Sequence, residues 1–216
     1  SPMAAAIGSV NTLLRRQDGT LYGDNTDAFG FESLLRHASL DPRGKKCLVL
    51  GSGGASVTVQ AVLRHLGAGS VTVISRSGKD NYHNLFRHQD AELIVNATPV
   101  GMYPGNGLAA VDLTAFPNCR GVADLIYNPA RTALLLQAER LDIPCAGGLW
   151  MLVAQAQRAA ELFTGTDIPE SVIPKITASL RREMENLVLV GMPGSGKTTI
   201  AMALAEKLGR PVLDVD

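Results

Sequence analysis

A glycine-rich segment, Gly51 to Ser56, follows the apolar run Lys46 to Leu50 and precedes a stretch with helical spacing, Ala55 to Leu66. Glycines at such a position let the backbone turn tightly, and the free N–H groups that open the helix favour a pyrophosphate. An ordinary glycine-rich turn is the alternative, because a lone glycine pattern is weak without the flanking strand and helix. We predict a dinucleotide site whose contacts include Gly51, Ser52, Gly53, Gly54 and Ala55.

The residues after the second apolar run indicate which dinucleotide is bound. An NAD site places Asp or Glu roughly 20 residues after the glycines, where the acid accepts a hydrogen bond from the ribose 2′-OH. This chain has Ser75, Arg76 and Ser77 there. A guanidinium pairs with the 2′-phosphate of NADP, whereas an acid repels it. The segment therefore predicts NADP as the cofactor; a solvent-exposed arginine without a ligand is the alternative.

A second phosphate-binding pattern, Gly191 to Thr198, has the complete spacing G-x-x-x-x-G-K-[ST]. It follows an expected strand, Leu187 to Val190, and opens an expected helix, Thr198 to Leu208. In such loops backbone N–H groups surround the phosphates, the lysine reaches their oxygens and the threonine ligates magnesium. A glycine-rich linker is the alternative. The pattern predicts ATP and Mg²⁺ as ligands, bound by Gly191, Gly194, Gly196, Lys197 and Thr198.

Short apolar runs that alternate with helical patterns must position these loops. Strands are expected at 46–50, 71–74, 93–95 and 121–126, with helices over 55–66, from about residue 129, and over 149–163 and 168–185. Such alternation predicts an α/β fold, a Rossmann-like doubly wound parallel sheet, with ligands beyond the carboxyl ends of its strands. Ahead of the sheet, two stretches that flank Gln17-Asp18-Gly19 predict a β-hairpin.

Composition argues against several classes of function. The 20 basic and 20 acidic residues cancel, so no net charge attracts nucleic acid or an anionic membrane. No stretch approaches the roughly 20 apolar residues that a membrane-spanning helix needs, and no signal peptide is expected. Cys47, Cys119 and Cys145 are odd in number and far apart, which indicates buried thiols of a cytoplasmic protein.

Six segments in one order resemble successive signatures of shikimate dehydrogenases. They are IGSVNT (7–12), GDNTD (23–27), GSGGAS (51–56), NATPVGM (96–102), DLIYNP (124–129) and GLWMLVAQA (148–156). The resemblance covers about residues 3 to 180 and implies reversible, NADP-dependent hydride transfer between shikimate and 3-dehydroshikimate. Quinate stays open as an alternative substrate.

The resemblance also implies roles for residues around the substrate. Asn11 and Asp27 are expected to hydrogen-bond hydroxyls of the substrate ring, and Asp27 is the expected catalytic residue, paired in the family with a lysine. Gln155 is expected to reach the same ring, and Tyr127 to lie near the substrate carboxylate. A helix cap before Ala28 to Leu35 is the alternative role for Asp27, and the two roles are compatible.

At the nicotinamide end of the cofactor the resemblance implies contacts from Leu125 and Gly148, with Thr98 in the loop beneath. The family's N-x-T-x-P-x-K segment, which carries the catalytic lysine, is not among these 216 residues. Lys45 and Lys46 begin a strand at the end of the sheet opposite to the predicted crevice, so they cannot replace it. We therefore expect this chain to bind NADP but to oxidise shikimate very poorly or not at all.

The stretch from residue 186 onward resembles the start of shikimate kinase. Asp214-Val215-Asp216 matches that family's D-x-D, so Asp214 is expected to serve Mg²⁺ beside Thr198 in an intact kinase domain. The chain is then interpreted as a fragment of a bifunctional dehydrogenase–kinase. Its expected parts are the C-terminal part of a substrate-binding domain (1–40), an NADP-binding domain (41–148), closing helices and a linker (149–185) and the start of a P-loop domain (186–216).

Two alternatives to a dehydrogenase remain open at this point. The main activity of the parent protein could be that of an ATP-dependent shikimate kinase, or the chain could be a non-catalytic NADP-binding module. Exposed sheet edges would also invite pairing into a homo-oligomer.

Overall fold

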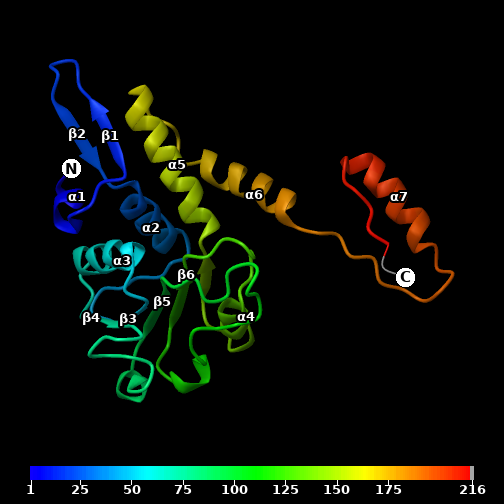
Figure 1. The fold of residues 1–216 in the computed structure, drawn as a ribbon, viewed down its shortest axis with the longest axis horizontal. Coiled ribbons are helices and arrows are strands. Elements are labelled where there is room, and N and C mark those ends of the chain that lie inside the picture. The colour runs from blue at the N-terminus through cyan, green and yellow to red at the C-terminus, as the bar shows by residue number, and fades with distance from the viewer. Residues whose placement is uncertain (215–216) are drawn as a thin grey trace. The chain divides into compact units, whose positions relative to one another are not determined.

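The structure, a computed structural model, describes residues 1–214 and divides into two compact units (Figure 1). The first unit runs from Ser1 to Arg181, and the second begins at Arg182. Within residues 1–214 no helix has both the length and the apolar content to cross a membrane.

Five parallel strands form the central sheet of the first unit, in the order β4-β3-β5-β6-β7. The chain adds β4 on one side of β3 and the later strands on the other, which creates a switch point at the carboxyl end of β3. The predicted parallel α/β sheet is confirmed, whereas β7 was not predicted because its three residues are too few to form a pattern. The strands are β3 (Lys46–Leu50), β4 (Ser70–Ile74), β5 (Leu93–Asn96), β6 (Gly121–Asp124) and β7 (Cys145–Gly147).

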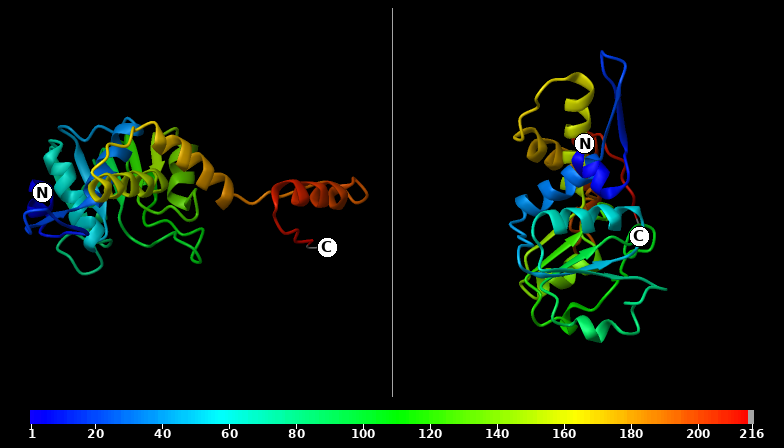
Figure 2. Two further views of the ribbon diagram at one scale, coloured as in Figure 1. Left: turned by 90° about the horizontal axis from the view of Figure 1, so that it is seen from above. Right: turned by 90° about the vertical axis from the view of Figure 1, so that its left-hand side faces the viewer.

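The strands are apolar on both sides because helices cover both faces of the sheet (Figures 1 and 2). Val49 and Val95 pack under α2, α3 and α5, whereas Leu48 and Ile94 pack under α4 and the two short 3-10 helices. This arrangement is the doubly wound one that the sequence predicts. The helices are α2 (Thr26–His37), α3 (Gly54–His65), α4 (Ala133–Arg140), α5 (Leu149–Thr164), η1 (Leu85–His88) and η2 (Leu113–Ala115).

The predicted hairpin is present as β1 (Thr12–Arg15) and β2 (Leu21–Asp24), which pair antiparallel. In its turn, Asp18 Oδ1 accepts hydrogen bonds from the N–H and the hydroxyl of Thr20, at 2.9 and 2.7 Å. A short helix, α1 (Pro2–Ile7), precedes the hairpin and was not predicted. The hairpin leads directly into α2, so it places the end of β2 beside the start of that helix.

Two helices begin later than predicted. Helix α4 begins at Ala133 because the hydroxyl of Thr132 accepts a hydrogen bond from its first turn. Helix α6 (Val172–Met184) begins after a turn in which the Ile168 carbonyl accepts a hydrogen bond from Gln157 Nε2 at 2.5 Å. A polar side chain thus caps the first turn of α4, and another holds the segment that precedes α6.

The second unit contains one further helix, α7 (Lys197–Leu208), between Gly196 and Gly209, which both have left-handed backbone conformations. The prediction of a strand at Leu187 to Val190 is wrong, because the structure has no strand there. A strand needs a neighbour to accept its hydrogen bonds, and the described part of this unit contains no other strand. Val188 and Val190 are accordingly 78% and 91% exposed.

Candidate cofactor and substrate site

The turn between β3 and α3 depends on a glycine at position 51. Gly51 has a φ of 102°, and a Cβ there would lie 2.8 Å from the Ala97 carbonyl oxygen and 2.9 Å from Thr98 Cγ2. The Gly51 N–H donates to the carbonyl of Ile74 at 2.8 Å. The turn therefore lies directly against the loop that carries Thr98, beyond the carboxyl ends of β3 and β5.

The N-terminus of α3 is open to solvent. Residues Ser52 to Ala55 are exposed, and no atom lies within 4 Å of where a Cβ would be at Gly53 or Gly54. Gly53 has no side chain to cap the helix, so the first N–H groups stay free for an anion. Ser56, in place of the usual third glycine, is completely buried and accepts a hydrogen bond from Gln60 Nε2. These features fit a bound pyrophosphate.

Arg76 follows β4 and is exposed, in a loop where the Ser75 N–H donates to the Asp80 carbonyl at 3.2 Å. Within residues 1–214 its guanidinium forms no ion pair with a carboxylate. Burial raises the pKa of the Tyr82 hydroxyl, and the nearby charge of Arg76 partly opposes that rise. Ser77 is exposed beside it. The exposed position of Arg76 suits recognition of a 2′-phosphate, and its charge acts on the nearby Tyr82 hydroxyl.

Leu125 and Gly148, expected at the nicotinamide end, are in direct contact. A Cβ at Gly148 would lie only 2.0 Å from the Leu125 carbonyl oxygen. The Gly148 N–H donates to the carbonyl of Ile126 at 2.9 Å. The first turn of α5 is therefore fixed against the segment that follows β6.

Buried polar residues beneath this region were not singled out from the sequence. Asp124 and Asn96 are fully buried at the ends of β6 and β5, and Asn96 Nδ2 donates to Asp124 Oδ1 at 3.0 Å. Asn96 Oδ1 accepts from the N–H and hydroxyl of Thr98, while Thr132 Oγ1 donates to Asp124 Oδ2 at 2.6 Å. A polar residue that ends an otherwise apolar strand was the available signal.

On the substrate side, Asn11 connects the hairpin to the start of α2. Its Nδ2 donates to Asp27 Oδ1 at 3.0 Å, and its Oδ1 accepts from the Thr26 N–H at 2.9 Å. Burial raises the pKa of Asp27, and the hydrogen bond from Asn11 partly opposes the rise. The cap of α2 is Asn25, whose side chain accepts from the N–H of Ala28, so the alternative role of Asp27 as the cap is wrong.

Gln155 approaches α2 through a close contact with a glycine. A Cβ at Gly30 would lie 2.6 Å from both Gln155 Cγ and the Met151 carbonyl oxygen. Gly30 is one turn after Asp27, so the two share a face of α2. Tyr127 lies in the segment after β6 and is 45% exposed. The structure thus joins Asn11 to Asp27 directly and brings Gln155 to the same helix, whereas Tyr127 makes no hydrogen bond to them.

In the second unit, the loop before α7 curls around its lysine. Lys197 Nζ donates to the carbonyls of Gly191 and Met192 at 3.0 and 3.1 Å. Thr198 Oγ1 lies 3.5 Å from Asp214 Oδ2, so the two predicted Mg²⁺ ligands are adjacent. Gly194 and Gly196 have φ values of 76° and 81°, as the bends of the loop require.

Val215 and Asp216 of the predicted D-x-D lie outside the described residues. Within residues 1–214, no three His, Cys, Asp or Glu side chains gather as a metal site.

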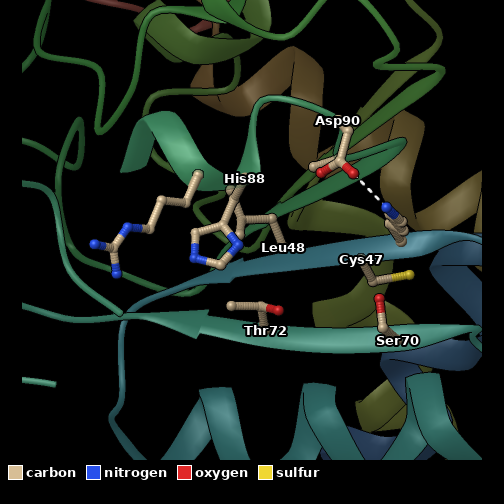
Figure 3. Close-up of a pocket in the computed structure, with 9 residues that line it drawn as sticks. Cys47, Leu48, Ser70, Thr72, His88 and Asp90 are labelled. Atoms are coloured by element: carbon tan, nitrogen blue, oxygen red, sulfur yellow. Dashed lines mark hydrogen bonds and ion pairs between the residues drawn. The ribbon is translucent and has the colours of Figure 1, made fainter. Parts of the chain in front are cut away.

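Two hollows of the first unit lie away from these residues. One, of about 180 Å³, lies at the amino ends of β3 and β4 and includes the Lys46–Asp90 ion pair (Figure 3). The other, of about 380 Å³, lies between Phe116 and Ile143, near the amino ends of β6 and β7. Open parallel sheets bind ligands beyond the carboxyl ends of their strands, so neither hollow is the predicted cleft. The place of Lys46 agrees with the expectation that it does not serve the reaction.

Comparisons with known proteins give the family. A model of the shikimate 5′-dehydrogenase C-terminal domain matches residues 148–173, and one of the ATPase family associated with various cellular activities matches residues 187–216. A Geobacter shikimate dehydrogenase (NADP(+)) is 38% identical over 203 residues, covering 83% of this chain and 69% of the relative.

Two solved structures share the fold of most of the chain. A chorismate mutase/shikimate 5-dehydrogenase fusion protein from Clostridium acetobutylicum has a TM-score of 0.80 and 32% identity, covering 86% of this chain and 72% of that one. Shikimate 5-dehydrogenase from Thermus thermophilus, in complex with NADP(H) and shikimate, has a TM-score of 0.71 and 32% identity, covering 83% and 71%. With the motifs, the sheet and these relatives in agreement, the chain belongs to the shikimate dehydrogenase family.

Proposed function

We propose that the first unit binds NADP across the carboxyl ends of its parallel sheet and serves hydride transfer between shikimate and 3-dehydroshikimate. The observation that carries the proposal is the open N-terminus of α3, which lies against the Thr98 loop at the switch point of the sheet. In the proposal the free N–H groups of α3 hold the pyrophosphate, and Arg76 holds the 2′-phosphate. Thr98, Leu125 and Gly148 surround the nicotinamide.

The substrate ring is proposed to lie between the hairpin, α2 and α5. Bound there, NADP would supply the acceptor for the hydride released when the ring alcohol becomes a ketone. The hydroxyl proton must leave at the same centre, and a carboxylate with a raised pKa is suited to share it. Asp27 has such a pKa, and Asn11 orients its carboxylate. Gln155 is assigned to a ring hydroxyl, and Tyr127 to the region of the substrate carboxylate.

Calorimetric titration with NADP and, separately, with NAD tests the cofactor assignment. Charge-assisted hydrogen bonds contribute about 1.5–3 kcal/mol, so Arg76→Ala should weaken NADP binding by about 10–150-fold and leave NAD binding unchanged. Arg140→Ala, which removes an exposed arginine from the last turn of α4, is the matched control and should change neither. Equal binding of NADP and NAD by the unmodified chain would refute the assignment.

NADP binding and substrate oxidation can be measured separately on this chain. The 216 residues contain Asp27 but no segment like that which carries the family's catalytic lysine. We therefore expect NADP binding with very little oxidation of shikimate or quinate, followed as NADPH absorbance. Rapid turnover by this chain would show that another group handles the proton.

For the second unit we propose binding of ATP with Mg²⁺, as the start of a shikimate kinase. Support comes from Lys197 on the loop carbonyls, from the adjacent Thr198 and Asp214, and from the match to a family of ATPases over residues 187–216. Titration with MgATP, with Lys197→Ala as the variant, tests this proposal. Binding of MgATP without binding of NADP would instead favour a kinase as the main activity of the protein.

The cysteines bear on the localisation of the protein, and the sheet edges bear on its oligomeric state. Cys47, Cys119 and Cys145 are free thiols, which supports the proposal of a cytoplasmic protein. Strands β4 and β7 are the two edges of the sheet, so pairing of two copies there is a prediction that light scattering can check.

A further inference from the structure

Asp124 is a carboxylate that the fold buries without a cation. Its side chain is fully buried, and within residues 1–214 no lysine, arginine or histidine forms an ion pair with it. Burying a charge is costly unless hydrogen bonds compensate for the lost water. An apolar residue at this position, next to Val122 and Ala123 on β6, would avoid that cost. The carboxylate therefore calls for an explanation beyond packing.

Three donors from three segments converge on this carboxylate. Asn96 Nδ2, at the end of β5, and the Ile126 N–H donate to Oδ1 at 3.0 and 3.1 Å. The hydroxyl of Thr132, which also caps α4, donates to Oδ2 at 2.6 Å. Each donor fits the ionised form, which has only acceptors. Asp124 thus fixes the end of β5, the segment after β6 and the start of α4 relative to one another.

Each of these segments leads to a residue assigned to the nicotinamide. Asn96 Oδ1 accepts from the N–H and hydroxyl of Thr98, at 3.1 and 2.6 Å, and so sets the position of that loop. Ile126 adjoins Leu125, and its carbonyl accepts the hydrogen bond from the Gly148 N–H. The hydrogen bonds therefore run without a gap from Asp124 to the surroundings of Thr98, Leu125 and Gly148.

We propose that Asp124 is a positioning residue, which holds the Thr98 loop and the Leu125 segment at the spacing that the nicotinamide end of NADP requires. The proposal rests on the cofactor site proposed above. It predicts an effect confined to one half of the cofactor, because Arg76 and the N-terminus of α3 are not bonded to this network.

The test compares two ligands that share the adenosine end. Calorimetry with NADP and with adenosine 2′,5′-bisphosphate, which lacks the nicotinamide, is performed on the 216-residue chain and on Asp124→Asn. Loss of one or two charge-assisted hydrogen bonds corresponds to about 10–150-fold weaker NADP binding, whereas bisphosphate binding should stay within about twofold. The fluorescence of bound NADPH, which reports on the nicotinamide surroundings, should shift towards that of the free cofactor.

If Asp124→Asn does not fold, a second pair of variants tests the same proposal. Thr132→Val removes the hydroxyl donor and should show the same ligand-selective loss, and Thr132→Ser, which keeps the donor, should restore binding. Folded variants that bind both ligands as the unmodified chain does, or that lose both equally, would overturn the positioning role. If the unmodified chain binds neither ligand, the cofactor site itself is refuted, and the positioning role with it.

Discussion

Replacing Gly148 with alanine should destabilise the contact between the segment after β6 and the start of α5. The added Cβ would lie 2.0 Å from the Leu125 carbonyl oxygen and 2.5 Å from the carbonyl carbon. Carbon–oxygen contacts are ordinarily about 3.3 Å or longer, so one of the two segments must move by about 1 Å. Overpacking of this kind costs about 1–3 kcal/mol. For a chain of this length, that corresponds to a Tm lower by about 2–12 °C.

Thermal unfolding followed by circular dichroism measures the stability loss, and calorimetry with NADP measures the effect on the site. We expect both to worsen, because the displaced segment carries Leu125. Gly105→Ala is the matched control: its Cβ would have only the Met102 carbonyl oxygen nearby, at 3.5 Å, and its φ is not positive. A Gly148→Ala chain with the Tm and the NADP affinity of the unmodified chain would refute the argument from this contact.

Two predictions concern pH. Burial raises the pKa of Asp27 in the folded chain, so ionisation of this carboxyl favours unfolding. Asp27→Asn should therefore raise the Tm at pH 7. The difference in Tm between the variant and the unmodified chain should narrow as pH falls towards 3.8, the ordinary pKa of the group. A lower Tm for Asp27→Asn than for the unmodified chain at pH 7 would contradict the claim that burying the Asp27 carboxylate destabilises the fold. The ring of His37 stacks on Trp150, with ring centroids 3.4 Å apart. Burial and the charge of Arg181 lower the pKa of His37, so protonation favours unfolding. The stability of the chain should therefore fall as pH drops through 6.5. Fluorescence of Trp150, the sole tryptophan, follows unfolding, and an unchanged pH dependence in His37→Gln would exclude this contribution.

The sheet was predictable because buried parallel strands are apolar on both faces, and because the run that ends at Leu50 is followed by a glycine-rich turn. Those runs indicate which loops lie at the carboxyl ends of the strands, and so predict that Gly51 and Leu125 lie at one edge of the sheet. The same reasoning failed at Leu187 to Val190, where an apolar run has no neighbouring strand in the described part of its unit. An apolar run indicates burial and a preference for extended backbone. A strand also needs a neighbouring strand as hydrogen-bonding partner, which the run itself does not show.

The polar contacts around the site could not be predicted from spacing. Asn96 and Asp124 are 28 residues apart, and only the adjacency of β5 and β6 makes their side chains meet. The N-cap of α2 was assigned to Asp27 as an alternative, although Asn25 holds that position. A difference of two residues in where a helix begins changes which side chain caps it, and sequence patterns place helix ends no better than that.

The pairing of α2 with α5 has a consequence for the order in which the chain folds during synthesis. Trp150 Nε1 donates to Ser33 Oγ across 117 residues of sequence, at 3.0 Å. Helix α2 therefore leaves the ribosome with part of its surface uncovered, and the entire sheet is made before its partner follows. Contacts between such distant residues form slowly, since a long loop must close first. We therefore expect the layer formed by α2 and α5 to be completed late in folding.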